Sequence, residues 1–175
     1  KPIIAAVNGH AVGVGITFSM LCDVRLVAED AKVQYAMVRR GVVPELASHV
    51  ILPRVIGFSK AAELMLTGRI LSGAEAAELG LASRAVPADQ VLTEAMSLGA
   101  EMVRNASPVA LAVSKQLLWQ GVTAGVDEML SREGRVISSI ARMPDAVEGV
   151  TAFFERRDAV WSGSVNESAD DLLEC

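Results

Sequence analysis

Asn8-Gly9-His10-Ala11-Val12-Gly13-Val14-Gly15 is the stretch of this chain that says most about its fold. A short apolar segment, Pro2-Ile3-Ile4-Ala5-Ala6-Val7, precedes it and has the character of a buried strand. An apolar run suited to a buried helix, Ile16-Thr17-Phe18-Ser19-Met20-Leu21, follows it. A strand, a glycine-rich turn and a helix start gather free backbone N–H groups at one point, where the helix dipole favours negative charge. The stretch therefore predicts an anion site, or an oxyanion hole if a carbonyl oxygen is held there.

Two nucleotide-binding motifs that also use glycine-rich turns do not match this stretch. The dinucleotide fingerprint requires glycine at position 18, where this chain has Phe18. The phosphate-binding P-loop requires Gly-Lys-Ser/Thr after the turn, and this sequence has no such triplet there. Gly13 and Gly15 alone also fit a turn whose glycines serve only backbone geometry. The turn by itself leaves both interpretations open.

The bulk composition indicates a folded domain and excludes several other classes. The chain has 175 residues, of which 51% are hydrophobic, and its mean hydropathy is +0.38. This length supports one domain with a real core, and this composition argues against disorder. A net charge of −5 disfavours a nucleic-acid-binding surface. No uninterrupted apolar run approaches the length of a membrane span, so we expect neither nucleic acid nor a membrane as a partner.

The cysteines and histidines suggest a reducing compartment and no metal site. Cys22 lies in an apolar helix and Cys175 at the terminus, which is not the pattern of a disulfide framework. His10 and His49 are the only histidines, and neither has a metal-ligand spacing. We expect a cytoplasmic protein, no bound metal, a structural role for His10, and a helix-end or loop-fixing role for Asp23.

Local signals predict short strands and helices in the first ninety residues and helices in the last seventy. Two short strands are expected within residues 24–35, around a turn at residues 28–31. Pro44 suits the first turn of a helix over residues 45–52 that stops near Pro53. The other expected elements are a helix at 59–66 ended by Gly68, a helix from the Ser72/Glu75 capping box to Gly80, a strand at 81–86, a helix at 87–105, a helix opened by Ser107-Pro108, helices at 123–141 and 144–156, and an irregular polar tail after Trp161.

Motifs distributed along the chain identify a family. The first signature runs from Lys1 through Asn8-Gly9 to Cys22-Asp23. The later motifs are Val43-Pro44-Glu45, Leu52-Pro53-Arg54-Val55-Ile56-Gly57, Leu66-Thr67-Gly68-Arg69, Ala74-Glu75-Ala76-Ala77-Glu78-Leu79-Gly80-Leu81 and Glu148-Gly149-Val150-Thr151-Ala152-Phe153-Phe154-Glu155-Arg156-Arg157. In this order and together, the motifs closely resemble the crotonase (enoyl-CoA hydratase/isomerase) superfamily, over residues 1 to about 161.

The resemblance implies an α/β fold: a crotonase-like spiral of strand-strand-helix units with a C-terminal helical trimerisation segment. Residues 1–105 would be the C-terminal part of the spiral core, and residues 106–175 a helical oligomerisation segment with a polar tail. The expected assembly is a homotrimer or a dimer of trimers. Family members are typically about half as long again, so the chain resembles a C-terminal portion of them.

The resemblance also implies an acyl-CoA thioester substrate, whose carbonyl lies between two backbone N–H donors that stabilise an enolate. Val14 matches the position of one donor, and Gly13 and Gly15 beside it are expected to contact substrate. The other donor, like the adenine-ribose and pantetheine contacts, belongs to the family's first third. Coenzyme A is part of the substrate, so no separate cofactor is expected.

The two glutamates with which hydratases of this family activate water are missing here. Their positions correspond to Thr17 and Met37. A hydroxyl and a thioether cannot carry protons as carboxylates do, so two-glutamate hydration is disfavoured. We expect Thr17 and Met37 to contact the substrate instead.

Glu45 is the carboxylate that remains in a promising place. It matches the Pro-Glu element of crotonase relatives, among them a group of enoyl-CoA isomerases, that carry their acid there. A single carboxylate suits a proton shuttle, as isomerisation of a 3-enoyl to a 2-enoyl thioester requires. A first-turn acid that only complements the helix dipole is the simpler interpretation of the same residue. His49, four residues later on the expected helix, would hydrogen-bond Glu45 or shape the acyl pocket.

Near the C-terminus, Phe153 and Arg156 match positions that approach the adenine and phosphates of CoA, often from a neighbouring subunit. A surface helix face with aromatic and basic residues is the alternative interpretation. Three functions therefore remain open, and the first is preferred: isomerisation by Glu45, hydration or thioester hydrolysis with Glu45 activating water, and a non-catalytic acyl-CoA-binding or assembly role.

Overall fold

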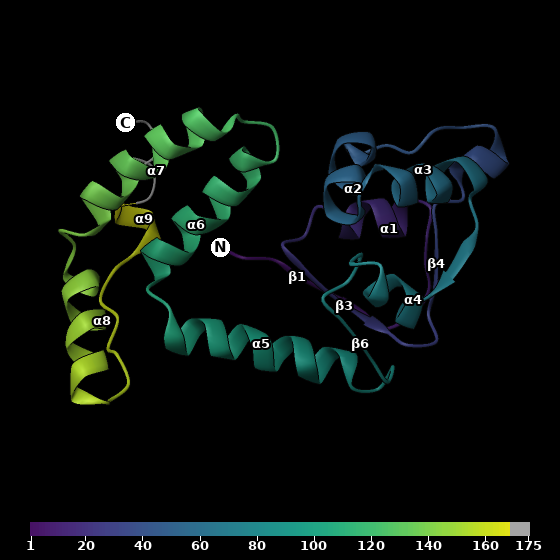
Figure 1. Cartoon of the computed structure of the whole chain (residues 1–175). Helices are drawn as coiled ribbons and strands as arrows, with labels where there is room; N and C mark the ends of the chain where they lie inside the picture. Colours follow the sequence, from purple (N-terminus) through teal and green to yellow (C-terminus); the bar gives the residue numbers. More distant parts are fainter. Residues whose placement is uncertain (169–175) are drawn as a thin grey trace. The chain divides into compact units, whose positions relative to one another are not determined.

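The computed structural model describes residues 1–168, which form two compact units (Figure 1). One unit consists of residues 3–98, and the other contains residues 1–2 and the chain from Gly99 onward. The division falls within one long helix, α5 (Val91–Asn105). Cys175 and the end of the expected polar tail lie outside the described residues.

Residues 3–98 contain two small sheets. The first has the order β1 (Ile4–Val7), β3 (Val24–Ala28), β6 (Arg84–Val86), and its strands are parallel. The second has the order β2 (Ala11–Val12), β4 (Lys32–Gln34), β5 (Ile70–Ser72), with β2 parallel and β5 antiparallel to β4. The two strands predicted around residues 28–31 are therefore β3 and β4, which belong to different sheets. Parallel pairing requires distant partners, and local sequence patterns do not specify them.

Short helices cover these strands, and local signals predicted several of their ends. Helix α3 (Phe58–Thr67) ends at Gly68, which has a φ of 58° in the left-handed region. Helix α4 (Gly73–Glu78) begins with the predicted capping box, in which Ser72 Oγ accepts from the Glu75 amide at 3.1 Å and Glu75 accepts from the Ser72 amide at 2.7 Å. Gly73 is required there, because a Cβ atom would lie 1.8 Å from the carbonyl oxygen of Ala28.

The helix predicted over residues 45–52 is wrong in its bounds. Helix α2 runs Ser48–Ile56, because Leu46 and Ala47 have φ of 55° and 56° and break the helical path after Glu45. Pro53 lies inside the helix and does not end it. The carbonyl that this proline deprives of a helical donor belongs to His49, which is exposed, so water can bind it.

The second unit is helical, as expected. It contains the end of α5, then α6 (Pro108–Gly121), α7 (Val126–Ile140), α8 (Pro144–Glu155) and α9 (Val165–Ser168), a short helix where an irregular tail was expected. Ser107 and Pro108 open α6, as predicted, although the Ser107 hydroxyl donates to Asp145 and makes no capping hydrogen bond to the helix. Val109, Val113 and Val136 form its buried cluster. Within residues 1–168, no helix combines the length and the apolar character needed to cross a bilayer.

Candidate active site

The glycine-rich turn connects β2 to the short helix α1 (Val14–Ser19). Gly13 has φ 60° and ψ −122°, a conformation that glycine adopts readily. Its amide donates to the Gln34 carbonyl at 3.0 Å, and its carbonyl accepts from the amides of Ile16 and Thr17. The N–H groups of Val14 and Gly15 precede the first helical bond and so have no carbonyl one turn before them. Both residues are exposed, which leaves the predicted donor of Val14 at the surface of the unit.

Thr17 joins this turn to Glu45. The Thr17 side chain is fully buried, and its Oγ1 donates to Glu45 Oε1 at 2.5 Å. The same hydroxyl lies 3.2 Å from the carbonyl oxygen of Val14. The residue that occupies one of the two missing glutamate positions therefore binds the carboxylate that the chain retains. The Thr17 hydroxyl thus lies between the Glu45 carboxylate and the carbonyl of Val14, although Thr17 and Glu45 are 28 residues apart in sequence.

The backbone around Glu45 is held in an unusual conformation. Pro44 before it is buried, and two consecutive left-handed residues, Leu46 and Ala47, follow it. Its carbonyl oxygen accepts from the Ser48 amide at 3.1 Å and from Ser48 Oγ at 2.5 Å. Left-handed non-glycine residues cost about 1–2 kcal/mol each and are concentrated at functional sites. Glu45 therefore lies outside the first turn of α2, which contradicts the interpretation that it complements a helix dipole from within that turn.

Met37 is placed differently from Thr17. It opens the 3-10 helix η1 (Met37–Arg40), and its side chain is only 6% exposed, within the core. Its carbonyl accepts from the Val42 amide at 3.2 Å, which folds the chain back toward Pro44. No described contact connects Met37 to Glu45. The predicted substrate contact of Met37 stays a prediction.

The two histidines are separate from the Thr17–Glu45 pair. His49 lies on α2, whereas Glu45 lies outside it, so the shared helix face predicted for them is wrong. Among residues 1–168, His49 makes no hydrogen bond to Glu45. His10 Nδ1 accepts from the Lys32 amide at 3.1 Å, which is the structural role expected of it. Asp23, expected to have a helix-end or loop-fixing role, accepts from the amide of Ile3, the residue before β1, at 2.6 Å.

Sequence reasoning missed Arg25, a half-buried cation on β3 that binds the chain just after α1. Its Nε donates to the Leu81 carbonyl at 2.7 Å, and its Nη1 donates to the Cys22 carbonyl at 2.7 Å. Burial lowers the pKa of this guanidinium, and nearby groups, Cys22 first among them, oppose the shift. Burial also raises the pKa of Tyr35, whose hydroxyl has no hydrogen-bond partner among the described residues. The signal for Arg25 was a single charge within the apolar strand Val24–Ala28.

Phe153 and Arg156 belong to the helical unit. Phe153 is 78% exposed on α8, and its ring contacts that of Phe154 edge to face, with 5.7 Å between centroids. Arg156 ends α8 in a left-handed conformation with φ 55° and is exposed. Phe153 also lines a surface hollow of about 220 Å³, together with Arg104, Arg157 and Trp161.

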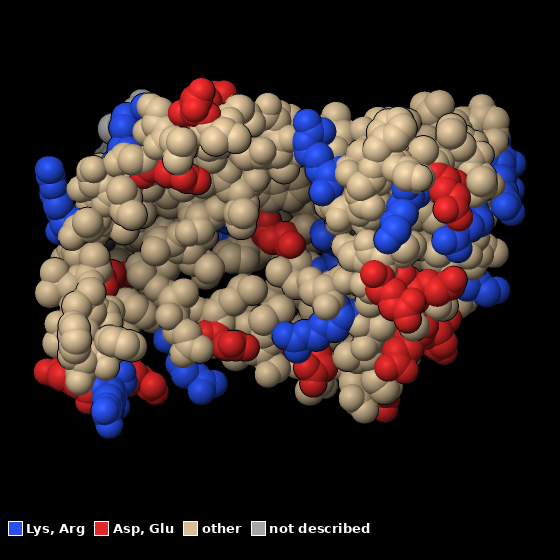
Figure 2. Space-filling model, viewed as in Figure 1, with Lys and Arg blue, Asp and Glu red and all other residues tan. Residues whose placement is uncertain are grey.

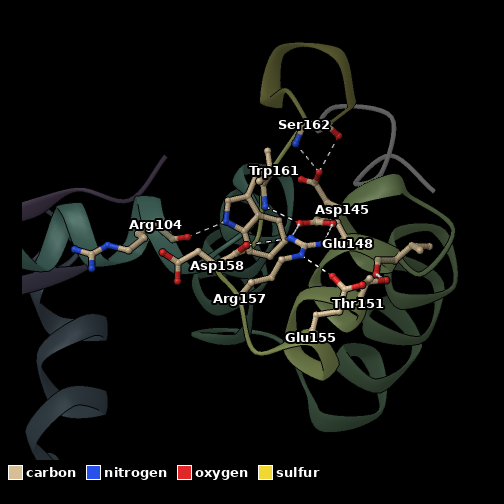
Figure 3. Close-up of polar contacts among 11 residues, drawn as sticks. Arg104, Asp145, Glu148, Thr151, Glu155, Arg157, Asp158, Trp161 and Ser162 are labelled. Carbon is tan, nitrogen blue, oxygen red and sulfur yellow. Dashed lines mark hydrogen bonds and ion pairs between the residues drawn. The ribbon is translucent and has the colours of Figure 1, made fainter.

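Ordered polar contacts support this part of α8 (Figure 3). Arg157 binds Glu148 through both Nη atoms, at 2.6 and 2.9 Å, and Trp161 Nε1 donates to the Arg104 carbonyl at 3.0 Å. Asp145 accepts from Ser162 at the edge of the same cluster. Arg156, the predicted CoA contact, is not among these ion pairs, whereas its neighbour Arg157 is.

The charged side chains form neither a basic surface on the face shown in Figure 2 nor a metal-binding cluster among the described residues. On the face drawn in Figure 2, basic side chains are interspersed with acidic ones, so its described residues form no continuous basic surface. Over residues 1–168, no group of three or more His, Cys, Asp or Glu is arranged to hold a metal ion.

Comparison with known proteins identifies the family. The family model described as enoyl-CoA hydratase/isomerase matches residues 1–164. A probable enoyl-CoA hydratase of Mycobacterium tuberculosis is 39% identical over 156 residues, which are 89% of this chain and 60% of that protein. A probable mitochondrial enoyl-CoA hydratase of Dictyostelium discoideum is 37% identical over 161 residues, 92% of this chain and 58% of that protein.

The structural comparison agrees. The crystal structure of a probable enoyl-CoA hydratase/isomerase from Mycobacterium abscessus matches with a TM-score of 0.90 and 38% identity, over 94% of this chain and 65% of that one. The chain belongs to the enoyl-CoA hydratase/isomerase family, and the predicted crotonase fold is confirmed. It spans about three fifths of the length of the two curated relatives above.

Proposed function

We propose that the protein isomerises 3-enoyl-CoA thioesters to 2-enoyl-CoA thioesters, with Glu45 as the proton shuttle. The hydrogen bond of 2.5 Å between Thr17 Oγ1 and Glu45 Oε1 carries this proposal. It fixes one carboxylate at the helix that begins with Val14, the residue that matches an oxyanion donor of the family. Glu45 is exposed, so a substrate can reach it.

The chemistry requires one base and one oxyanion site. The carboxylate of Glu45 removes a proton from C2, and the electrons of that C–H bond move toward the thioester carbonyl, giving a dienolate. The Val14 N–H stabilises the negative oxygen. The protonated Glu45 then returns the proton at C4, the electrons come back from the oxygen, and the double bond lies between C2 and C3. Nothing is consumed, so one carboxylate suffices.

The rest of the proposal follows the family resemblance. A second N–H donor would complete the oxyanion hole, from the region of the family that this chain does not match. Phe153 and Arg156 would contact the adenine and phosphate groups of CoA, and His49 and Met37 would border the acyl chain. CoA enters as part of the substrate, so no cofactor is required. A homotrimer would cover the exposed apolar residues of α7, which include Val126, Leu130 and Ile137.

Hydration of a 2-enoyl thioester is the second candidate, because both curated relatives above are called probable enoyl-CoA hydratases. Glu45 would then activate the water alone. Thr17 and Met37 argue against this candidate, since neither a hydroxyl nor a thioether takes up and releases a proton near neutral pH as a carboxylate does. Thioester hydrolysis by a water bound to Glu45 would show the same dependence on Glu45, but it would release free CoA.

The test is an ultraviolet assay of the full-length protein with trans-3- and trans-2-enoyl-CoA, followed at the absorption band of the conjugated thioester. We expect absorbance to rise with the 3-enoyl substrate and Glu45→Gln to slow that rise about 10²- to 10⁴-fold, the usual contribution of acid–base catalysis. Glu29→Gln, which neutralises an exposed carboxylate at a turn of the same unit, is the matched control and retains activity. Falling absorbance with the 2-enoyl substrate would establish hydration instead. No turnover of either substrate would overturn the proposal.

A further inference from the structure

We propose that Thr17 is a positioning residue that holds Oε1 of Glu45 and leaves Oε2 as the oxygen that moves the proton. This inference rests on the proposed function. It concerns a position for which the family resemblance implied the loss of a glutamate and a contact with the substrate.

The geometry of the Thr17 hydroxyl distinguishes two acceptors. A hydroxyl has one hydrogen to donate, and Oγ1 lies 2.5 Å from Glu45 Oε1 and 3.2 Å from the Val14 carbonyl. Hydrogen bonds to ionised oxygens are shorter and about twice as strong as neutral ones. The hydrogen therefore lies toward Glu45 while that residue is ionised and able to act as a base.

A second buried hydroxyl on the same helix shows that this contact is not needed to satisfy Thr17. Ser19 is 5% exposed, and its Oγ donates to the Ile16 carbonyl at 2.8 Å, as the Thr17 hydroxyl could donate to Val14. A backbone acceptor is thus within reach of both hydroxyls. Of these two hydroxyls only that of Thr17 binds a carboxylate, and that carboxylate is the one to which the proposed function gives the chemistry.

The bond also distinguishes the two oxygens of Glu45. Oε1 accepts from Thr17, whereas Oε2 makes no hydrogen bond with any residue in the range 1–168. The unbound oxygen takes the proton from C2 and returns it at C4, while Oε1 stays an acceptor in both protonation states. The carboxylate therefore keeps its orientation between the two half-reactions, and only the proton and the electrons move.

The experiment compares Thr17→Val, Thr17→Ser and Ser19→Ala in the full-length protein. Valine has the shape of threonine without the hydroxyl, and serine restores the hydroxyl without the methyl group. We expect Thr17→Val to lower kcat about 10- to 100-fold with KM within about twofold, since misplacing a catalytic group costs up to about 10². Thr17→Ser should recover most of kcat, and Ser19→Ala should retain it.

Three outcomes would overturn the inference: full kcat in Thr17→Val, a loss that serine does not recover, or a crystal structure of Thr17→Val in which the Glu45 carboxylate keeps its place. The crystal structure tests the position of the Glu45 carboxylate directly, so it decides the question even if Thr17→Val has no measurable activity. Glu45→Gln, measured alongside, separates the two proposals. If Glu45→Gln is inactive while Thr17→Val keeps its kcat, only the positioning role fails; if Glu45→Gln keeps its activity, the proposed function itself fails.

Discussion

Glu45 and Asp145 are two carboxylates near helix starts that their surroundings treat in opposite ways. Asp145, in the first turn of α8, is 6% exposed and accepts from the Ser107 hydroxyl, the Ser162 amide and hydroxyl, and the Gly163 amide, at 2.7 to 3.1 Å. The Glu45 carboxylate, in contrast, accepts one hydrogen bond among the described residues, from the Thr17 hydroxyl. A carboxylate with hydrogen bonds to both oxygens stabilises a fold, whereas one with a free oxygen is able to exchange a proton.

The pKa of Asp145 reflects these hydrogen bonds. Burial works to raise it, but the hydrogen bonds from Ser162, Ser107 and Gly163 together outweigh burial and hold the pKa below its ordinary value. A depressed pKa means that the folded protein favours the ionised form more than the unfolded chain does. The resulting stability is present above the unfolded pKa, near 3.8, and is lost as the pH falls further.

The largest expected effect on stability comes from Asp145→Asn. Asparagine keeps the shape but loses the charge, and with its oxygen toward Ser162 and Gly163 its NH₂ group faces Ser107 Oγ in place of an accepting oxygen. Hydrogen bonds to charged groups contribute about 1.5–3 kcal/mol each, and the substitution weakens all of those that Asp145 accepts. We expect a loss of about 3 kcal/mol in the free energy of unfolding at pH 7, measured by urea denaturation, and a smaller loss at pH 3. Glu45→Gln is the matched variant and should lie within about 0.5 kcal/mol of the unmodified protein. Equal stability of the two variants would erase the contrast between the carboxylates.

A smaller effect, of opposite sign, is expected from Ala47→Gly in the strained turn after Glu45. Glycine adopts the φ of 56° without the strain that alanine has there, so we expect a gain of about 0.5–1 kcal/mol in stability. The turn then holds Glu45 less firmly, and turnover should fall severalfold.

Ala100→Gly provides the control for this variant. Ala100 is exposed within α5, where glycine costs about 1 kcal/mol relative to alanine and should leave kcat unchanged. If Ala47→Gly destabilises the protein as much as Ala100→Gly does, the turn stores no strain.

Local chemistry explains which parts of the fold were predictable. The Ser72/Glu75 capping box, the end of α3 at Gly68 and the start of α6 at Ser107-Pro108 depend on a few neighbouring residues, and the structure has all of them. The start of α2 was missed because Leu46 and Ala47 are not residue types that signal a left-handed turn.

The site was predictable only in part, for a related reason. The glycine turn and Glu45 were identified from motifs that the family shares, and the turn leads into a helix start as expected. The Thr17–Glu45 bond joins residues that only tertiary folding brings together, so no local pattern could indicate it. For the same reason, the sequence predicted Thr17 to be a lost acid position and a substrate contact, whereas the structure shows it hydrogen-bonded to Glu45, the acid that remains.

The smallest expected effect concerns Glu148, a second carboxylate on α8 that is held by hydrogen bonds and so can be compared with Glu45. Its carboxylate accepts from both Nη atoms of Arg157, at 2.6 and 2.9 Å, and from the Val160 amide at 2.7 Å. These bonds, that of Arg157 first, lower the pKa of Glu148 to about 2. The stabilisation is therefore complete above the unfolded pKa of about 4.5 and is lost as the pH falls toward 2.

Glu148→Gln should accordingly lower the midpoint of thermal unfolding slightly at pH 6, and the difference from the unmodified protein should shrink as the pH falls from 4.5 to 2. Because Glu148 is at the surface, added salt should reduce the effect at pH 6 as well, through screening of the Arg157 charge. Glu45→Gln in the same series should show no such dependence on salt, since its hydrogen-bond partner, Thr17, is neutral. A difference for Glu148→Gln that stays constant from pH 6 to 2 would mean that the Arg157 contact does not depend on ionised Glu148.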